Sequence, residues 1–146
     1  NAWDIGFRGT NIIVNGGVSQ GTTDEPERTG TAAVYIATGG FASVTTVDES
    51  LLIQDAEANL AIPNGAGNGW YNYSGFGNPN PAQDNLITPI PGRVLVFKTT
   101  EGHFAKVEIV SYYKDAPENP NGFADEARYY TFNYVYNPNK GETSLE

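Results

Sequence analysis

Residues 129–136 read Tyr-Tyr-Thr-Phe-Asn-Tyr-Val-Tyr. Every second residue from Tyr130 to Tyr136 is aromatic, and side chains two apart in a β-strand share one face of the sheet. The stretch contains no charge, no glycine and no proline. It therefore predicts a regular strand, and its four aromatic side chains on one face are expected to bury a large apolar area.

The residues upstream of this strand predict further antiparallel strands. Residues 94–99 and 104–113 are apolar runs joined by Thr100-Glu101-Gly102, which fits a hairpin turn closed by a left-handed glycine. Residues 48–60 are the only stretch with helical character, enough for one or two turns. We predict an all-β, mostly antiparallel domain with long Gly/Pro/Asn-rich loops and little helix. The other predicted strands cover residues 5–8, 11–14, 32–37 and 70–73.

The length of the chain indicates the number of domains, and its charge indicates which partners it can bind. The 146 residues fit one domain, which we assign to residues 1–144, with Leu145-Glu146 expected to be a cloning remnant. The chain opens at Asn1 without a methionine, so we expect that an upstream segment was removed. The 17 acidic residues outnumber the 8 basic ones. This charge would be repelled by phosphate backbones, so nucleic acid is excluded as a partner.

Catalytic and metal-binding groups are scarce. The chain has no cysteine, which excludes thiol nucleophiles and thiolate metal sites. Its one histidine, His103, follows Gly102 at the predicted turn, where a solvated surface position is expected. Residues 118–122 resemble a calcium loop, but Pro117 and Arg128 would then occupy two ligand positions. An EF-hand is excluded, and an irregular calcium site stays open.

An aromatic cluster borders two loops rich in Gly, Pro and Asn. Trp70, Tyr71, Tyr73 and Phe76 fall within seven residues, next to Gly75. Such clusters either fill the end of a hydrophobic core or stack on a flat or sugar-like ligand. We take Trp70, Tyr71, Tyr73, Gly75 and Phe76 as the candidate ligand-binding residues.

Three stretches, in this order and spacing, form a recognisable pattern that spans nearly the whole chain. They are Trp3-Asp4-Ile5-Gly6-Phe7-Arg8 running to Asn15-Gly16-Gly17, the hairpin from Arg93-Val94-Leu95-Val96-Phe97 through Gly102 and Ala105-Lys106-Val107 to Tyr112, and the closing Tyr130-Thr131-Phe132-Asn133-Tyr134. The pattern resembles the HmuY family of haem-binding lipoproteins from Bacteroidetes. Because that family usually has one or more strands before the Trp-Asp motif, the resemblance implies that such strands are missing ahead of Trp3.

The resemblance implies a function and a location. It implies an exported protein, secreted or anchored at the outer-membrane surface, that captures haem and passes it to an outer-membrane transporter. In the best-known members two histidines hold the iron. Their positions correspond here to about Gly75 and to the segment Asp48–Asn64, neither of which offers a histidine, and the methionines that some relatives use are absent. The resemblance therefore implies haem as the cofactor, although the iron ligands of the family are missing. Tyr71 or Tyr73, as tyrosinate, is an alternative ligand for the iron.

Two other functions stay open beside capture of haem or another flat hydrophobic ligand. The first is a carbohydrate-binding or adhesion module that uses the rings of Trp70, Tyr71, Tyr73 and Phe76 against sugar faces. The second is a hydrolase with a pair of carboxylates in a cleft, although no spacing among the acidic residues selects a pair. We expect a binding protein and not an enzyme.

Overall fold

The computed structural model describes residues 3–146 and contains eight strands and three single 3-10 turns in that range. The turns cover Phe41–Ser43, Glu49–Leu51 and Pro81–Gln83. The strands are β1 (Ile5–Arg8), β2 (Asn11–Val14), β3 (Ala33–Thr38), β4 (Tyr71–Tyr73), β5 (Ile87–Pro89), β6 (Arg93–Lys98), β7 (Phe104–Tyr113) and β8 (Ala127–Asn137).

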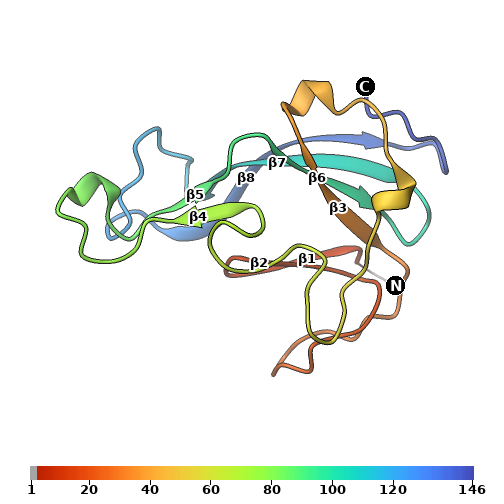
Figure 1. Cartoon of the computed structure of the whole chain (residues 1–146), viewed down its shortest axis with the longest axis horizontal. Coiled ribbons are helices and arrows are strands. Elements are labelled where there is room, and N and C mark those ends of the chain that lie inside the picture. Colours follow the sequence, from red (N-terminus) through yellow and green to blue (C-terminus); the bar gives the residue numbers. More distant parts are fainter. Residues whose placement is uncertain (1–2) are drawn as a thin grey trace.

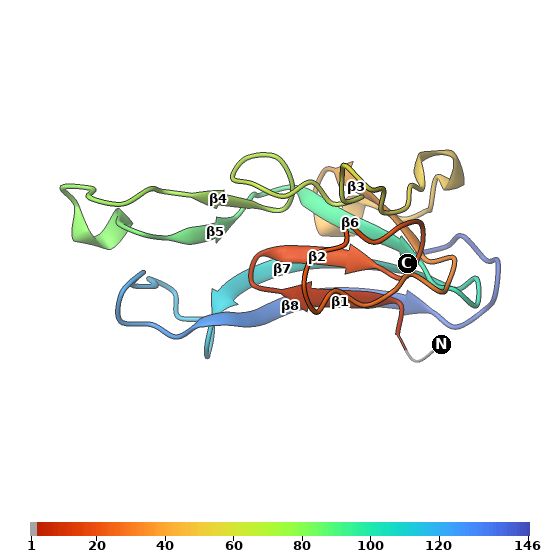
Figure 2. The ribbon, with the colours of Figure 1, turned by 90° about the horizontal axis from the view of Figure 1, so that it is seen from below.

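All strand pairs are antiparallel, which confirms the predicted all-β class. The main sheet has the order β3-β6-β7-β8, and two hairpins, β1–β2 and β4–β5, accompany it. The β1–β2 hairpin lies across one face of the main sheet (Figure 2). The β4–β5 hairpin projects from the body of the molecule as a finger, beside the loop that precedes β8 (Figure 1).

The predicted hairpin of β6 and β7 is confirmed. Lys98 pairs with Phe104 at its end, and the Thr99 amide donates to the His103 carbonyl at 2.8 Å. Gly102 has a φ of 87°, the left-handed conformation that the turn requires and that glycine adopts without strain. Strand β7 is an interior strand of the main sheet, because β6 and β8 pair with its two edges.

The segment predicted to have helical turns forms only one. Asp48 caps the 3-10 turn at Glu49–Leu51 by accepting a hydrogen bond from the Ser50 amide. The chain then runs beside β3, where Val34 and Ile53 exchange two backbone hydrogen bonds of 2.9 and 3.0 Å. This bridge protects the β3 edge of the sheet from pairing with another strand.

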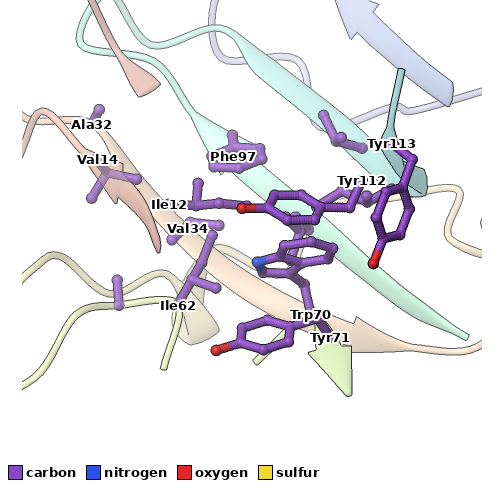
Figure 3. Packing of buried hydrophobic residues seen from close by; sticks show 14 of the residues in the cluster. Ile12, Val14, Ala32, Val34, Ile62, Trp70, Tyr71, Phe97, Tyr112 and Tyr113 are labelled. Atoms are coloured by element: carbon purple, nitrogen blue, oxygen red, sulfur yellow. The ribbon is translucent and has the colours of Figure 1, made fainter. Parts of the chain in front are cut away.

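The main core lies between one face of the sheet and the β1–β2 hairpin. Ile12 and Val14 of β2 pack there against buried side chains of the sheet, and Trp70 closes one end (Figure 3). Because β1 and β2 have four residues each whereas β7 has 10 and β8 has 11, the hairpin covers only part of this face.

A second, smaller core covers the opposite face of the sheet. It contains Val94, Val96 and Phe104, all fully buried. Leu145, which we assigned to a cloning remnant outside the domain, is also fully buried here, and its amide donates to the Thr45 carbonyl at 2.8 Å. The folded unit therefore includes Leu145.

The aromatic face of β8 is not buried, contrary to the sequence prediction. Phe132, Tyr134 and Tyr136 keep 41%, 66% and 45% of their surface exposed. Only Tyr130 is largely covered, because Phe7 packs on its ring at 4.7 Å and its hydroxyl donates to the Gly9 carbonyl at 2.7 Å. The β1–β2 hairpin covers β8 at Tyr130 and leaves the next three rings open.

A buried ion cluster fixes the N-terminal hairpin and its loop. The Asp55 carboxylate accepts hydrogen bonds from the amides of Val14 at 3.1 Å and Ala61 at 2.9 Å. The Arg28 guanidinium lies 3.0 Å from Asp55 and 2.6 Å from Glu25, and its side chain is only 1% exposed. One carboxylate thus joins β2, residue 61 and the loop before β3.

We expect Asp55→Ala to destabilise the fold by about 3–5 kcal/mol, the usual cost of removing one partner from a buried ion pair. The change leaves two buried amides without an acceptor and Arg28 with Glu25 alone. Urea denaturation followed by circular dichroism measures the effect. The matched control is Glu57→Ala, which removes an exposed carboxylate nearby and should change stability by less than about 0.5 kcal/mol. A loss below 1 kcal/mol for Asp55→Ala would contradict this role.

Candidate functional site

The open part of the sheet face forms an apolar groove of about 440 Å³. Strands β6 and β7 provide its floor, β8 one wall and β1 the other. Among residues 3–146, no charged side chain lines it. Its lining residues are Ile5, Phe7, Leu95, Phe97, Ala105, Val107, Phe132, Tyr134 and Tyr136. We call this hollow the apolar groove.

The register of β7 and β8 explains the shape of the groove. Val107 pairs with Tyr134, and Ala105 pairs with Tyr136, so small floor residues lie beside large wall residues. The rings of Phe132 and Tyr134 stand edge to face with centroids 6.2 Å apart. Aromatic walls above an apolar floor suit a flat apolar ligand, which could stack on the rings and exclude water from the floor.

Three hydrogen-bonding side chains lie around the apolar groove, at Tyr130, His103 and Tyr136. At one end the Tyr136 hydroxyl and Nδ1 of His103 are hydrogen-bonded at 2.8 Å, with the Glu101 carboxylate 4.0 Å from the same nitrogen. His103 is therefore not the freely solvated histidine that we expected. Next to the other end, burial raises the pKa of Tyr130 well above its ordinary value. The Tyr130 hydroxyl already donates to the Gly9 carbonyl at 2.7 Å, so its hydrogen is used within the protein.

Trp70 and Tyr71, two of the predicted ligand-binding residues, lie in the core. Trp70 is 2% exposed, and its indole nitrogen donates to the Thr10 carbonyl at 2.8 Å. Figure 3 shows its ring between those of Tyr71 and Tyr112, with centroid distances of 5.0 and 5.7 Å. The Tyr71 ring is buried too, and its hydroxyl accepts a 3.3 Å hydrogen bond from Thr10. Both rings are therefore covered by other residues of the protein and are not exposed to a ligand.

The other three predicted residues lie on the projecting finger. Tyr73 is partly exposed, and its hydroxyl donates to the Asn85 side chain at 2.9 Å. Phe76 is 80% exposed and meets Phe123, from the loop before β8, with ring centroids 5.8 Å apart. Gly75, at a φ of 86°, has open space where a side chain would begin. We call Tyr73, Phe76 and Phe123 the finger cluster.

The predicted ligand-binding residues thus divide between the core and the finger. The four-ring sugar platform of the carbohydrate hypothesis does not form as a unit, because two of its rings face inward. The apolar groove was missed at the sequence level, although its strongest signal, the alternating aromatics of β8, was recognised. That signal was interpreted as core, since the sequence does not say which part of the sheet the short β1–β2 hairpin covers.

Comparison with known proteins identifies the family. A family model described as HmuY protein matches residues 1–134. The chain belongs to the HmuY family. No curated protein matches the chain. The HmuY family is a haem-binding, non-enzymatic family whose members are extracellular or surface-associated. Within residues 3–146, the chain forms no helix long and apolar enough to cross a membrane.

The side chains present here do not fit the two-histidine iron clamp implied by the resemblance to HmuY proteins. The chain has one histidine and no methionine. The resemblance places one family histidine at about Gly75, and no histidine lies near that position in the sequence. Among the described residues, no three His, Cys, Asp or Glu side chains gather where they could hold a metal ion. The two-histidine pair that the resemblance implies therefore has no counterpart in this sequence.

We expect Trp70→Phe to lower stability by about 1–3 kcal/mol, because it removes a buried hydrogen bond and leaves a small cavity. Phe76→Ala, which truncates an exposed ring, should change stability by less than about 0.5 kcal/mol. Thermal denaturation of both variants provides the comparison. Equal stability of the two variants would show that the Trp70 ring is not part of the core.

Proposed function

We propose that this protein captures a flat, apolar ligand of the tetrapyrrole class in the apolar groove. The observation that carries the proposal is a hollow walled by exposed aromatic rings in a member of a haem-binding family. Exposed apolar surface of this extent is costly in water, and burying it beneath a planar ring stabilises the complex.

Recognition in this proposal depends on the ring and not on the iron. Phe132, Tyr134 and Tyr136 stack on or enclose the macrocycle, while Ala105 leaves room beneath it. Bound haem would supply an iron centre, but only His103 lies close to the groove as a nitrogen ligand. The described residues that line the groove are apolar or aromatic, which suits binding, and the proposed role is binding without catalysis.

The finger cluster is the alternative location for the same ligand. Phe76 and Phe123 are exposed and touch each other across two loops, and Gly75 beside them leaves open space. Tyr73 is the one member of the finger cluster that carries a phenol. We prefer the apolar groove because it is concave, and concave sites cover more of a ligand than a pair of protruding rings.

The proposed location of the protein is inferred from the family. We propose an exported protein, secreted or held as a lipoprotein at the outer-membrane surface. It would release its ligand to an outer-membrane haem transporter. Weak contacts to the iron suit such a transfer, because ring stacking can be lost stepwise as the ligand moves to its next site.

We expect haemin and metal-free protoporphyrin IX to bind with dissociation constants within about threefold of each other. The reason is that ring contacts dominate, and 1.4 kcal/mol corresponds to a tenfold change in affinity. Titration followed by the Soret band for haemin and by porphyrin fluorescence for protoporphyrin IX measures both constants. Strong haemin binding with no protoporphyrin binding would show that the iron is recognised and would contradict the proposal.

Two matched double variants locate the site. Phe132→Ser with Tyr134→Ser removes two exposed rings of the apolar groove and should weaken both porphyrins at least tenfold, by loss of stacking and apolar contact. Phe76→Ser with Phe123→Ser removes two exposed rings of the finger cluster and should change binding less than twofold. The reverse result would assign the ligand to the finger. Absence of porphyrin binding to the unmodified protein would reject this function and leave a glycan array as the next experiment.

A further inference from the structure

A second hollow, of about 270 Å³, lies on the face of the β1–β2 hairpin that is turned away from the main sheet (Figure 2). Successive side chains of a strand point to opposite faces. In β1, Ile5 lines the apolar groove, whereas Gly6 and Arg8 line the second hollow. In β2, Ile12 lies in the core, whereas Ile13 lines the second hollow. We call this hollow the outer pocket.

The outer pocket has an apolar floor and a polar rim. Gly6 pairs with Ile13 across the hairpin, and a Cβ added at Gly6 would lie 2.9 Å from Cγ1 of Ile13. Glycine at this position therefore keeps the floor open. Leu60, which is 6% exposed, adds a second apolar side chain. The polar lining residues come from the hairpin and from the loop after β2, and they are Arg8, Asn11, Gln20, Thr22, Asp24 and Glu25.

The loop that walls the outer pocket is held in place by buried charges. The Glu25 side chain is 8% exposed and lies 2.6 Å from the Arg28 guanidinium, which also pairs with Asp55. On the hairpin side, Nη1 of Arg8 donates to the Thr23 carbonyl at 2.7 Å. The wall is thus attached to the core and to the hairpin. A wall fixed before binding lowers the cost of ordering a site around its ligand.

Two opposite charges at the rim are not paired with each other. The charge of Glu25 is balanced by Arg28. Arg8 and Asp24 both line the outer pocket, but neither takes part in an ion pair within residues 3–146. Because Arg8 donates to the carbonyl of Thr23, its guanidinium lies beside the residue that precedes Asp24. A ligand that carries one positive and one negative group would satisfy both charges through strong hydrogen bonds.

We propose that the outer pocket binds a free α-amino acid with an apolar side chain. The ligand carboxylate pairs with Arg8, because a planar guanidinium matches a carboxylate with two parallel hydrogen bonds. The ligand ammonium pairs with Asp24. The apolar side chain of the ligand covers Ile13 and Leu60 and removes their exposed surface from water. A hollow of about 270 Å³ lies just below the range of about 300–1,000 Å³ for drug-sized ligands, which suits a molecule this small.

This site is separate from the proposed tetrapyrrole site. The outer pocket and the apolar groove use opposite faces of β1, so either ligand can bind without the other. Phe7 borders both hollows, and it is therefore left unchanged in the tests below. Failure of amino-acid binding would leave the tetrapyrrole proposal as it stands, and the reverse also holds.

Titration of the protein with L-leucine, followed by amide NMR, tests the proposal without changing the chain. We expect saturable shifts at Arg8, Ile13 and Asp24, with a dissociation constant of about 0.1–1 mM for so small a ligand. N-acetyl-L-leucine lacks the ammonium and L-leucinamide lacks the carboxylate, so each should bind at least about tenfold more weakly. Equal binding of either analogue overturns the proposal, as does the absence of saturation below about 20 mM leucine. Saturable binding of maltose instead would assign the pocket to a neutral sugar and also overturn it.

Matched variants assign the two charges. Arg8→Gln and Asp24→Asn should each weaken leucine binding at least about tenfold. Asparagine suits position 24 because Asp24 has a φ of 63°, a left-handed conformation that asparagine tolerates. Glu27→Gln and Lys140→Gln remove one exposed charge of each sign from outside the pocket lining and should change the affinity less than about twofold. Leucine affinity that is unchanged in Arg8→Gln or in Asp24→Asn would contradict the proposed contacts.

Discussion

The β1–β2 hairpin is too short to cover the apolar face of the sheet on which it packs. Its strands have four residues each, whereas β7 and β8 have 10 and 11. Where the hairpin lies, Ile12 and Val14 complete a close-packed core. Where it ends, Phe132, Tyr134 and Tyr136 stand open above Val107 and Ala105. The apolar groove exists because of this mismatch in length.

The hairpin is held at one place by contacts that do not depend on the groove. Asp55 binds the β2 backbone and Arg28, and Tyr130 donates to the carbonyl of Gly9 at the hairpin turn. Trp70 donates to the next carbonyl in that turn, at Thr10. The hairpin therefore cannot slide along β8 to cover the exposed rings without breaking buried hydrogen bonds. A rigid edge beside an apolar floor is a pre-formed site, which lowers the cost of ordering on binding.

The sequence predicted seven of the eight strands, because local patterns determine them, and missed the three-residue β5 (Ile87–Pro89). The alternation in β8 and the glycine at 102 have direct physical meanings, and both features are confirmed. The exposure of Phe132 and Tyr134 could not be predicted, because burial of a strand face depends on what packs over it from elsewhere in the chain. The same limit applies to Trp70, whose neighbour Tyr112 is distant in sequence, and to His103, which meets Tyr136 33 residues away.

The central claim is that a member of the HmuY family without the family's iron ligands still holds the ring of a flat ligand in the apolar groove. Methyl NMR of the protein with metal-free protoporphyrin IX tests it directly, because the porphyrin ring current shifts nearby methyl signals. The account predicts large shifts for Ile5, Leu95 and Val107, whose side chains line the groove. Shifts confined to Ala82 and Ala124, near the finger cluster, would contradict it.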